Sequence, residues 1–102
     1  MEGSVLEIRE FQKLMHDLYF ENDSKRGVLG NFAWLISEVG ELARAIRSGD
    51  KSKIEEEFAD VFAWLASLAN VLDVDIEEAA MKKYPGKCPR CGQNPCKCVF
   101  RV

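Results

Sequence analysis

The chain has 102 residues, enough for one small domain of three or four helices but with a large surface relative to its core, so self-association is expected. Its 14 Lys and Arg residues and 17 Asp and Glu residues give a net charge of −3. This balance offers no basic surface for DNA or RNA, so no polymeric nucleic acid is expected as a partner. No apolar run approaches the ~18 residues of a membrane span, and the charges in residues 1–10 do not fit a signal peptide, so a cytoplasmic protein is predicted.

Apolar residues recur every three or four positions along most of the chain, and strand alternation is nearly absent, which predicts an all-α fold. A first helix is expected from Ser4, which with Glu7 forms a potential capping box, to about Glu21. The next stretch, residues 21–30, is polar with two glycines and predicts a loop. Asn31 is the expected N-cap of a second helix.

The second helix is expected to end at residues 48–50, and a third helix follows over residues 54–72, with Asp50 or Ser52 as its N-cap. The second half of this third helix is apolar on nearly all sides, so it is predicted to be the most buried element.

A short fourth helix is predicted to start at a second capping box, formed by Asp75 and Glu78, and to end before Pro85 and Gly86. The expected fold is therefore a small antiparallel bundle of about four helices in residues 1–86, followed by an irregular cysteine-rich tail in residues 87–102. A helical hairpin with so apolar a central helix usually completes its bundle with a second copy, which predicts a homo-oligomer.

Two pairs of acidic residues lie on consecutive predicted helices, Glu38 with Glu41 and Glu57 with Asp60. Residues three apart share a helix face, and antiparallel helices can bring the two pairs together. Converging carboxylates repel one another and lose hydration unless a hard divalent cation such as Mg²⁺ or Mn²⁺ offsets their charge. A solvated acidic face is the alternative, but two such pairs, each beside a tryptophan, favour a metal site.

The segments WLISEVGELARAI, residues 34–46, and EEEFADVFAWLASLAN, residues 55–70, resemble the E-x-x-E and E-x-x-D signature of the MazG-like family. Further similarity surrounds Lys83-Tyr84-Pro85, and the resemblance covers roughly residues 5–85. It implies a dimeric or tetrameric α-helical enzyme that hydrolyses a nucleoside triphosphate between the α and β phosphates, with pyrophosphate as a product and nucleotide-pool housecleaning as a role. Ser37 stands where many relatives carry a second glutamate.

Under this resemblance, Glu38, Glu41, Glu57 and Asp60 are the predicted catalytic and Mg²⁺-binding residues. Either Glu41 or Glu56 could act as the general base. The candidate substrate-binding residues are Asn31, Trp34, Lys83 and Tyr84. Of these, Lys83 could balance phosphate charge, as could Lys82 or Arg26, and the other three could hold the base by stacking or an amide hydrogen bond. Ordinary core packing is the alternative for Trp34 and Trp64.

All four cysteines of the sequence lie between Cys88 and Cys98. The sequence CPRCG, residues 88–92, is typical of a zinc knuckle, and a C-x-C pair follows. A structural Zn²⁺ ion is therefore predicted, bound by Cys88, Cys91, Cys96 and Cys98. Because the intervening loop is short, closure within one chain is expected to be strained, so a metal shared between subunits, disulfide bonds and free thiols remain alternatives.

Two other functions fit the sequence. A phosphoribosyl-ATP pyrophosphohydrolase would share the fold and the carboxylates, so the substrate could be that nucleotide. A non-catalytic helical adaptor with a zinc tail would bind protein partners, and it predicts neither Mg²⁺ affinity nor any nucleotide product.

Overall fold

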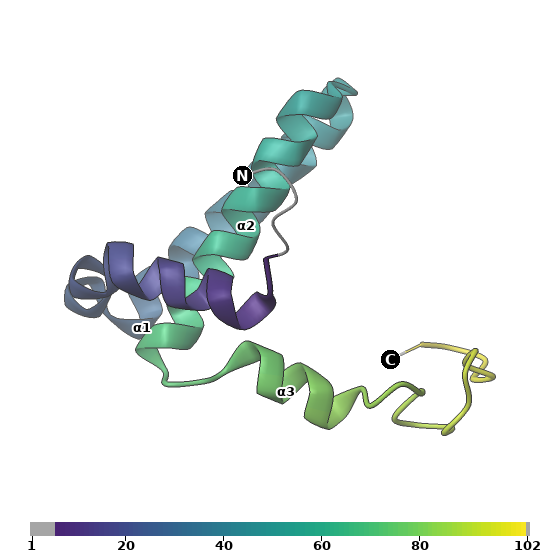
Figure 1. Ribbon diagram of the computed structural model, residues 1–102. Helices are drawn as coiled ribbons and strands as arrows, with labels where there is room; N and C mark the ends of the chain where they lie inside the picture. The colour runs from purple at the N-terminus through teal and green to yellow at the C-terminus, as the bar shows by residue number, and fades with distance from the viewer. Residues whose placement is uncertain (1–5, 102) are drawn as a thin grey trace.

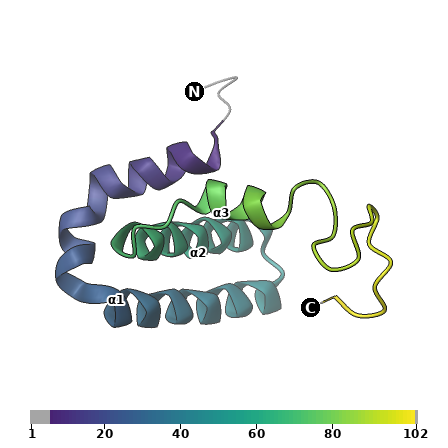
Figure 2. The ribbon, with the colours of Figure 1, turned by 90° about the horizontal axis from the view of Figure 1, so that it is seen from below.

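The computed structural model describes residues 6–101, and within that range it contains three helices and no strand (Figure 1). These helices are α1 (Ile8–Ser48), α2 (Lys51–Val71) and α3 (Ile76–Lys83). The two halves of α1 run along opposite sides of α2, so that α2 lies in the middle of the molecule (Figure 2). The prediction of an all-α fold with a cysteine-rich tail is confirmed.

The predicted loop at residues 21–30 is wrong, because helix continues through nearly all of it. Within α1, only Gly27 departs from helical geometry, with φ of 85° and ψ of 169°. Residues with a side chain rarely adopt so positive a φ, whereas glycine does so readily. This single residue divides α1 into two helical segments, so that the bundle has four segments, as predicted.

Two predicted helix starts are also corrected. Ser4 lies outside the described residues, and α1 begins at Ile8 with Glu7 as its N-cap. The backbone N–H of Glu7 donates to Glu10 Oε1 at 2.8 Å, so the capping box lies three residues further along than predicted. Asn31 lies inside α1 and does not cap a helix N-terminus.

The Asn31 side chain instead joins the two halves of α1. Its amide nitrogen donates to the carbonyl oxygens of Asp23 and Gly27, each at 2.7 Å, and its Oδ1 accepts from Arg26 Nη1 at 2.8 Å. Arg26 Nη1 also contacts Asp23 Oδ1 at 2.7 Å. Asn31 has 0% of its surface exposed and Asp23 has 3%, so this polar network is buried at the turn of α1.

The other helix ends follow the sequence closely. Helix α1 ends at Ser48, and Gly49 adopts a left-handed φ of 72°. Asp50 rather than Ser52 caps α2, accepting from the Ser52 N–H at 3.0 Å, and the helix starts at Lys51, three residues before the predicted start. Asp75 caps α3 by accepting from the Glu78 N–H at 3.0 Å, as predicted, but the reciprocal bond from the Asp75 N–H to the Glu78 side chain, which a capping box needs, is not formed in the described chain.

Aromatic pairs attach both halves of α1 to α2. Phe11 stacks on Phe62 with ring centroids 4.8 Å apart, and Trp34 stacks on Trp64 at 5.5 Å. The second half of α2 supplies buried Ala66, Ser67 and Ala69, in keeping with its central position. Several large apolar side chains of α1 and α2 nevertheless remain exposed in the single chain.

Polar contacts hold α3 against the first half of α1. Arg9 binds Asp75 at 2.9 Å and Glu77 at 3.0 Å. The pKa of Asp75 lies below its ordinary value. The hydrogen bond from the Glu78 N–H is the largest cause, and the hydrogen bond from the Arg9 side chain is the second. The Gln12 side chain donates to the Val74 carbonyl at 2.6 Å and accepts from the backbone N–H of Ile76, the first residue of α3, at 3.0 Å. The tail therefore leaves the bundle from a fixed helix (Figure 2).

None of the helices in residues 6–101 is both long and apolar enough to cross a membrane.

Candidate functional site

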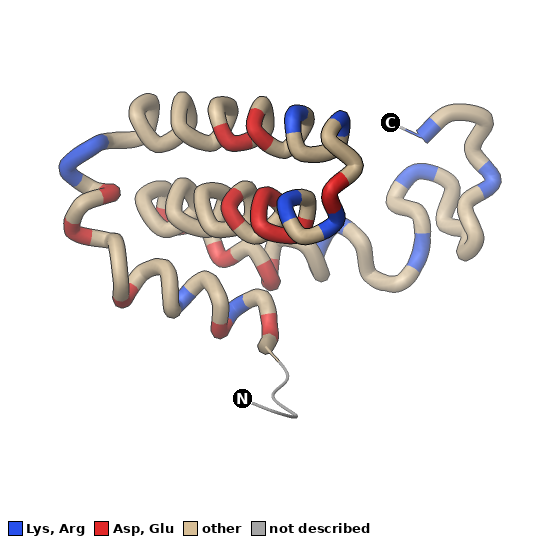
Figure 3. Tube along the Cα trace, turned by 90° about the horizontal axis from the view of Figure 1, so that it is seen from above, with Lys and Arg blue, Asp and Glu red and all other residues tan. Residues whose placement is uncertain are grey.

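Three of the four predicted carboxylates converge between α1 and α2. Glu38, on the second half of α1, and Glu57 and Asp60, on α2, each place a carboxylate oxygen within 4.8 Å of the others. The short turn at Gly49 and Asp50 makes the two helices antiparallel, which brings their acidic stretches side by side (Figure 3).

Within residues 6–101, no Lys or Arg side chain forms an ion pair with Glu38, Glu57 or Asp60. Burial raises the pKa of Glu38 and of Glu57, and the negative charge of Asp60 raises both further. The buried Oε1 of Glu57 has no hydrogen-bond partner within residues 6–101. A hard divalent cation would supply the charge and a ligand for this oxygen, so the residues present fit such an ion.

Glu41 lies beside this group rather than in it. It is half-buried, and its charge contributes to the raised pKa values of Glu38 and Glu57. Arg44 Nη2 lies 3.9 Å from Glu41 Oε2, one turn further along α1. The geometry therefore separates Glu41 from the three clustered carboxylates.

A cavity of about 350 Å³ adjoins the carboxylates, and Asp60 forms part of its wall. Arg26 also lines it, with its guanidinium carbon 5.0 Å from the centroid of the Trp64 ring. Asp23 lines it as well, and its buried Oδ2 has no hydrogen-bond partner in the described part of the chain. The cavity therefore combines aromatic surface, a cation and an unpaired acceptor beside the candidate metal site.

The sequence did not single out Asp23, because residues 21–30 were interpreted as a loop. A usable signal was present, since Asp23 and Arg26 are three residues apart and would share one helix face.

The predicted substrate-binding residues do not gather in one place. Trp34 is half-exposed on α1, where it stacks on Trp64, and Asn31 is fully buried. Lys83 Nζ lies 5.9 Å from the Tyr84 ring at the end of α3, and Tyr84 lines a different cavity together with Cys88. Their roles in substrate binding stay predictions.

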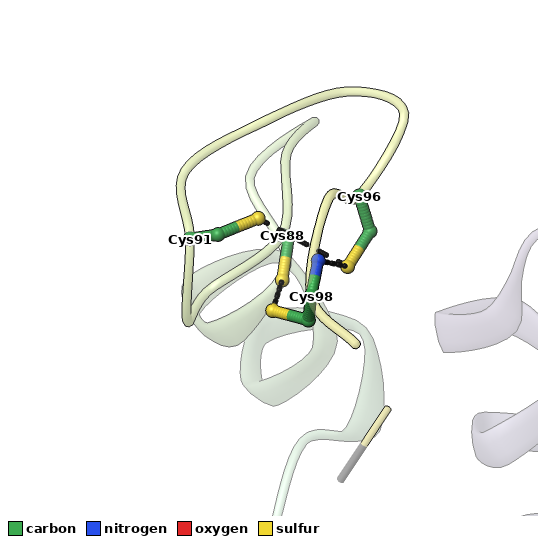
Figure 4. A group of neighbouring side chains, drawn as sticks. All are labelled: Cys88, Cys91, Cys96 and Cys98. Atoms are coloured by element: carbon green, nitrogen blue, oxygen red, sulfur yellow. Dashed lines mark hydrogen bonds between the residues drawn. The ribbon is translucent and has the colours of Figure 1, made fainter. Parts of the chain in front are cut away.

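The four cysteines form a second cluster, in the tail. Their Sγ atoms lie within 4.8 Å of one another, although the short loop suggested strained closure (Figure 4). Backbone N–H groups of Cys91 and Arg90 lower the pKa of Cys88 to about 6, whereas contact with the Cys96 side chain raises the pKa of Cys98 to about 12.

The chain is an all-α protein in which an antiparallel helical hairpin carries an E-x-x-E pair on one arm and an E-x-x-D pair on the other. Residues 26–92 match the MazG nucleotide pyrophosphohydrolase domain, and this chain belongs to that family. The chain is also 44% identical, over 61 residues, to the uncharacterized protein YpjD of Bacillus subtilis (strain 168). That alignment covers 50% of this chain and 55% of the relative, so the chain spans about half the length of the relative it matches.

The family match crosses the predicted domain boundary between residues 86 and 87. It includes Cys88 and Cys91 and ends at residue 92, before Cys96 and Cys98. The second cysteine pair therefore lies beyond the matched domain.

Proposed function

We propose that this chain is a divalent-cation-dependent nucleotide pyrophosphohydrolase, which hydrolyses a ribo- or deoxyribonucleoside triphosphate between the α and β phosphates. The observation that carries this proposal is the convergence of Glu38, Glu57 and Asp60 within 4.8 Å, with a buried Glu57 oxygen left unpaired in the described chain. Membership of the MazG family supports the reaction class. The enzyme would act in the cytoplasm to remove unwanted nucleotides from the pool.

Glu38, Glu57 and Asp60 would hold Mg²⁺ or Mn²⁺, since carboxylate oxygens are the ligands that hard cations prefer. When bound there, the ion supplies Lewis-acid stabilisation of the charge on the triphosphate oxygens. Burial and mutual repulsion raise the pKa of two of the three carboxylates, and a cation bound between them would relieve this repulsion.

Glu41 is the better of the two candidates for the general base. It is half-buried beside Glu38 and Glu57 but outside the group of three, so its carboxylate is available to accept a proton from the attacking water. Glu56 is exposed. We therefore assign Glu41 to proton transfer rather than to the metal.

The cavity beside Asp60 is the proposed site for the nucleoside. Tyr19 offers aromatic surface for stacking a base, whereas the Trp64 ring is already stacked on Trp34 and has the Arg26 guanidinium over it. Asn31 would act indirectly, because its hydrogen bonds fix Arg26 and the backbone of Asp23. Lys83 and Tyr84 remain proposed phosphate and base contacts.

A homo-oligomer, either a dimer or a tetramer, is also proposed. Four large apolar side chains occupy one stripe on the second half of α1, at spacings of three and four residues. These side chains and their exposed fractions are Leu29 (82%), Phe32 (48%), Ile36 (53%) and Val39 (45%). A second copy would bury this stripe, so light scattering should give the mass of two or four chains, and a monomer at every concentration would contradict the proposal.

The test of the function is a panel of the common NTPs and dNTPs, together with phosphoribosyl-ATP, assayed with Mg²⁺ or Mn²⁺. We expect at least one nucleotide to yield its monophosphate and pyrophosphate, and no product in the presence of a chelator. Turnover of phosphoribosyl-ATP alone would assign the alternative substrate. Release of orthophosphate in place of pyrophosphate, or no product from any nucleotide, would contradict the proposal, and the latter result would favour an adaptor.

A further inference from the structure

Between α3 and residue 101, the tail has a defined fold but buries none of its large apolar side chains. Val99 and Phe100 are 90% and 78% exposed. Two backbone hydrogen bonds close a tight turn, from Cys88 N to Gln93 O at 3.0 Å and from Gly92 N to Cys88 O at 2.8 Å. Asn94 Nδ2 also donates to the Gly86 carbonyl at 2.9 Å. These contacts are few for the conformational entropy that is lost when the segment is ordered, which indicates a further stabilising interaction.

The spacing of the cysteine sulfurs identifies that interaction. The Sγ atoms of Cys88 and Cys98 are 3.9 Å apart, as are those of Cys91 and Cys96, and all four point inward (Figure 4). A tetrahedral ion with Zn–S bonds of about 2.3 Å separates its ligands by about 3.8 Å, whereas a disulfide requires about 2.0 Å. The sulfurs are thus spaced for a shared ion and not for disulfide bonds.

Backbone N–H groups already point at three of the sulfurs. Cys88 Sγ accepts from Arg90 N at 3.4 Å and Cys91 Sγ from Lys97 N at 3.4 Å, while Cys96 Sγ accepts from Cys98 N at 3.3 Å. Hydrogen bonds of this kind stabilise thiolates and orient them toward a metal.

The charge of the tail complements a bound ion. Four thiolates around one Zn²⁺ ion carry a net charge of −2. The sequence has no Asp or Glu after Glu78, and the tail contributes Lys87, Arg90, Lys97 and Arg101. The surrounding side chains would therefore offset the negative charge of the site.

We propose that Cys88, Cys91, Cys96 and Cys98 of a single chain bind one structural Zn²⁺ ion, and that this ion holds the fold of the tail. Four protein ligands leave no open coordination position, so the site is structural rather than catalytic. It is separate from the carboxylate cluster, and half of its ligands lie beyond the matched family domain.

The test is the zinc content of the full chain, purified with a reducing agent and measured by elemental mass spectrometry. We expect one zinc per chain, lost in Cys96→Ser and Cys98→Ser but kept in Arg90→Ala and Lys97→Ala, which retain the backbone N–H donors. Glu57→Gln should also keep its zinc, which assigns the ion to the tail. Co²⁺ substitution should give the intense visible bands of a tetrahedral thiolate site in the wild-type chain.

Three results would overturn the proposal. They are four free thiols without zinc, disulfide bonds under reducing conditions, and half a zinc per chain, which would mean an ion shared between two copies. None of these measurements depends on nucleotide turnover, so they test the zinc site independently of the proposed activity.

Discussion

Replacing Asp60 by Asn, or Glu57 by Gln, is expected to lower Mg²⁺-dependent pyrophosphate release at least about a hundredfold, because a site ion supplies several kcal/mol of transition-state stabilisation and each 1.36 kcal/mol is tenfold in rate. Both changes keep the size of the side chain but remove one negative charge from a cluster whose oxygens lie within 4.8 Å. The measurement is initial-rate pyrophosphate release at saturating Mg²⁺, with helical circular dichroism to verify folding.

Glu55→Gln is the matched control, since it removes the same charge from an exposed position on α2, close in sequence to the cluster. We expect its rate to stay close to that of the wild-type chain. Near-normal turnover by Asp60→Asn or Glu57→Gln would show that these carboxylates do not hold the catalytic ion.

Glu57→Gln can also be tested without substrate, through the pH dependence of its thermal stability. The folded-state pKa values of Glu38 and Glu57 are raised above the ordinary 4.5, so ionisation of these groups opposes folding. Their contribution to stability is present below the unfolded pKa and is lost as the pH rises through the folded pKa. Without metal, Glu57→Gln should therefore have a higher melting temperature than the wild-type chain at pH 7, but not near pH 4. Adding Mg²⁺ at pH 7 should reduce this difference in melting temperature, because the ion stabilises the wild-type chain. An equal difference at both pH values would contradict the raised pKa.

Features set by local sequence could be predicted well. Asp50 and Asp75 cap helices because an aspartate side chain accepts from N–H groups two or three residues ahead, which involves no distant residue. The carboxylate pairs followed from helix spacing and a short connection, which fix the relative orientation of two helices. The convergence of Glu38 with Glu57 and Asp60 could therefore be predicted from the sequence.

The turn in α1 could not be predicted in the same way. Asp23 and Arg26 indicate a solvated loop when only their composition is considered, yet in the fold they are bonded to each other and to Asn31. Whether a polar residue faces water or a buried partner depends on packing against α2, which local propensity does not contain.

The buried position of Asn31 leads to the largest expected effect on stability. Asn31→Ala would leave the carbonyl oxygens of Asp23 and Gly27 without their amide donor and Arg26 without one acceptor. Each buried polar group left unsatisfied costs roughly 1–3 kcal/mol, so we expect the free energy of unfolding to fall by about 3–5 kcal/mol. That is a large share of the roughly 5–15 kcal/mol that stabilises a typical domain, and urea denaturation followed by circular dichroism would measure it.

Asn22→Ala is the control for this change, because Asn22 is an exposed asparagine of α1 next to Asp23, and such surface substitutions usually stay within about 0.5 kcal/mol. Asn31→Asp separates the two halves of the Asn31 network, since aspartate keeps the acceptor for Arg26 but loses both donors to the carbonyl groups. If the donors hold the two halves of α1 together, Asn31→Asp should lose most of the stability that Asn31→Ala loses. A loss below about 1 kcal/mol in both variants would mean that water replaces the amide at these carbonyl groups, and that Gly27 alone sets the turn.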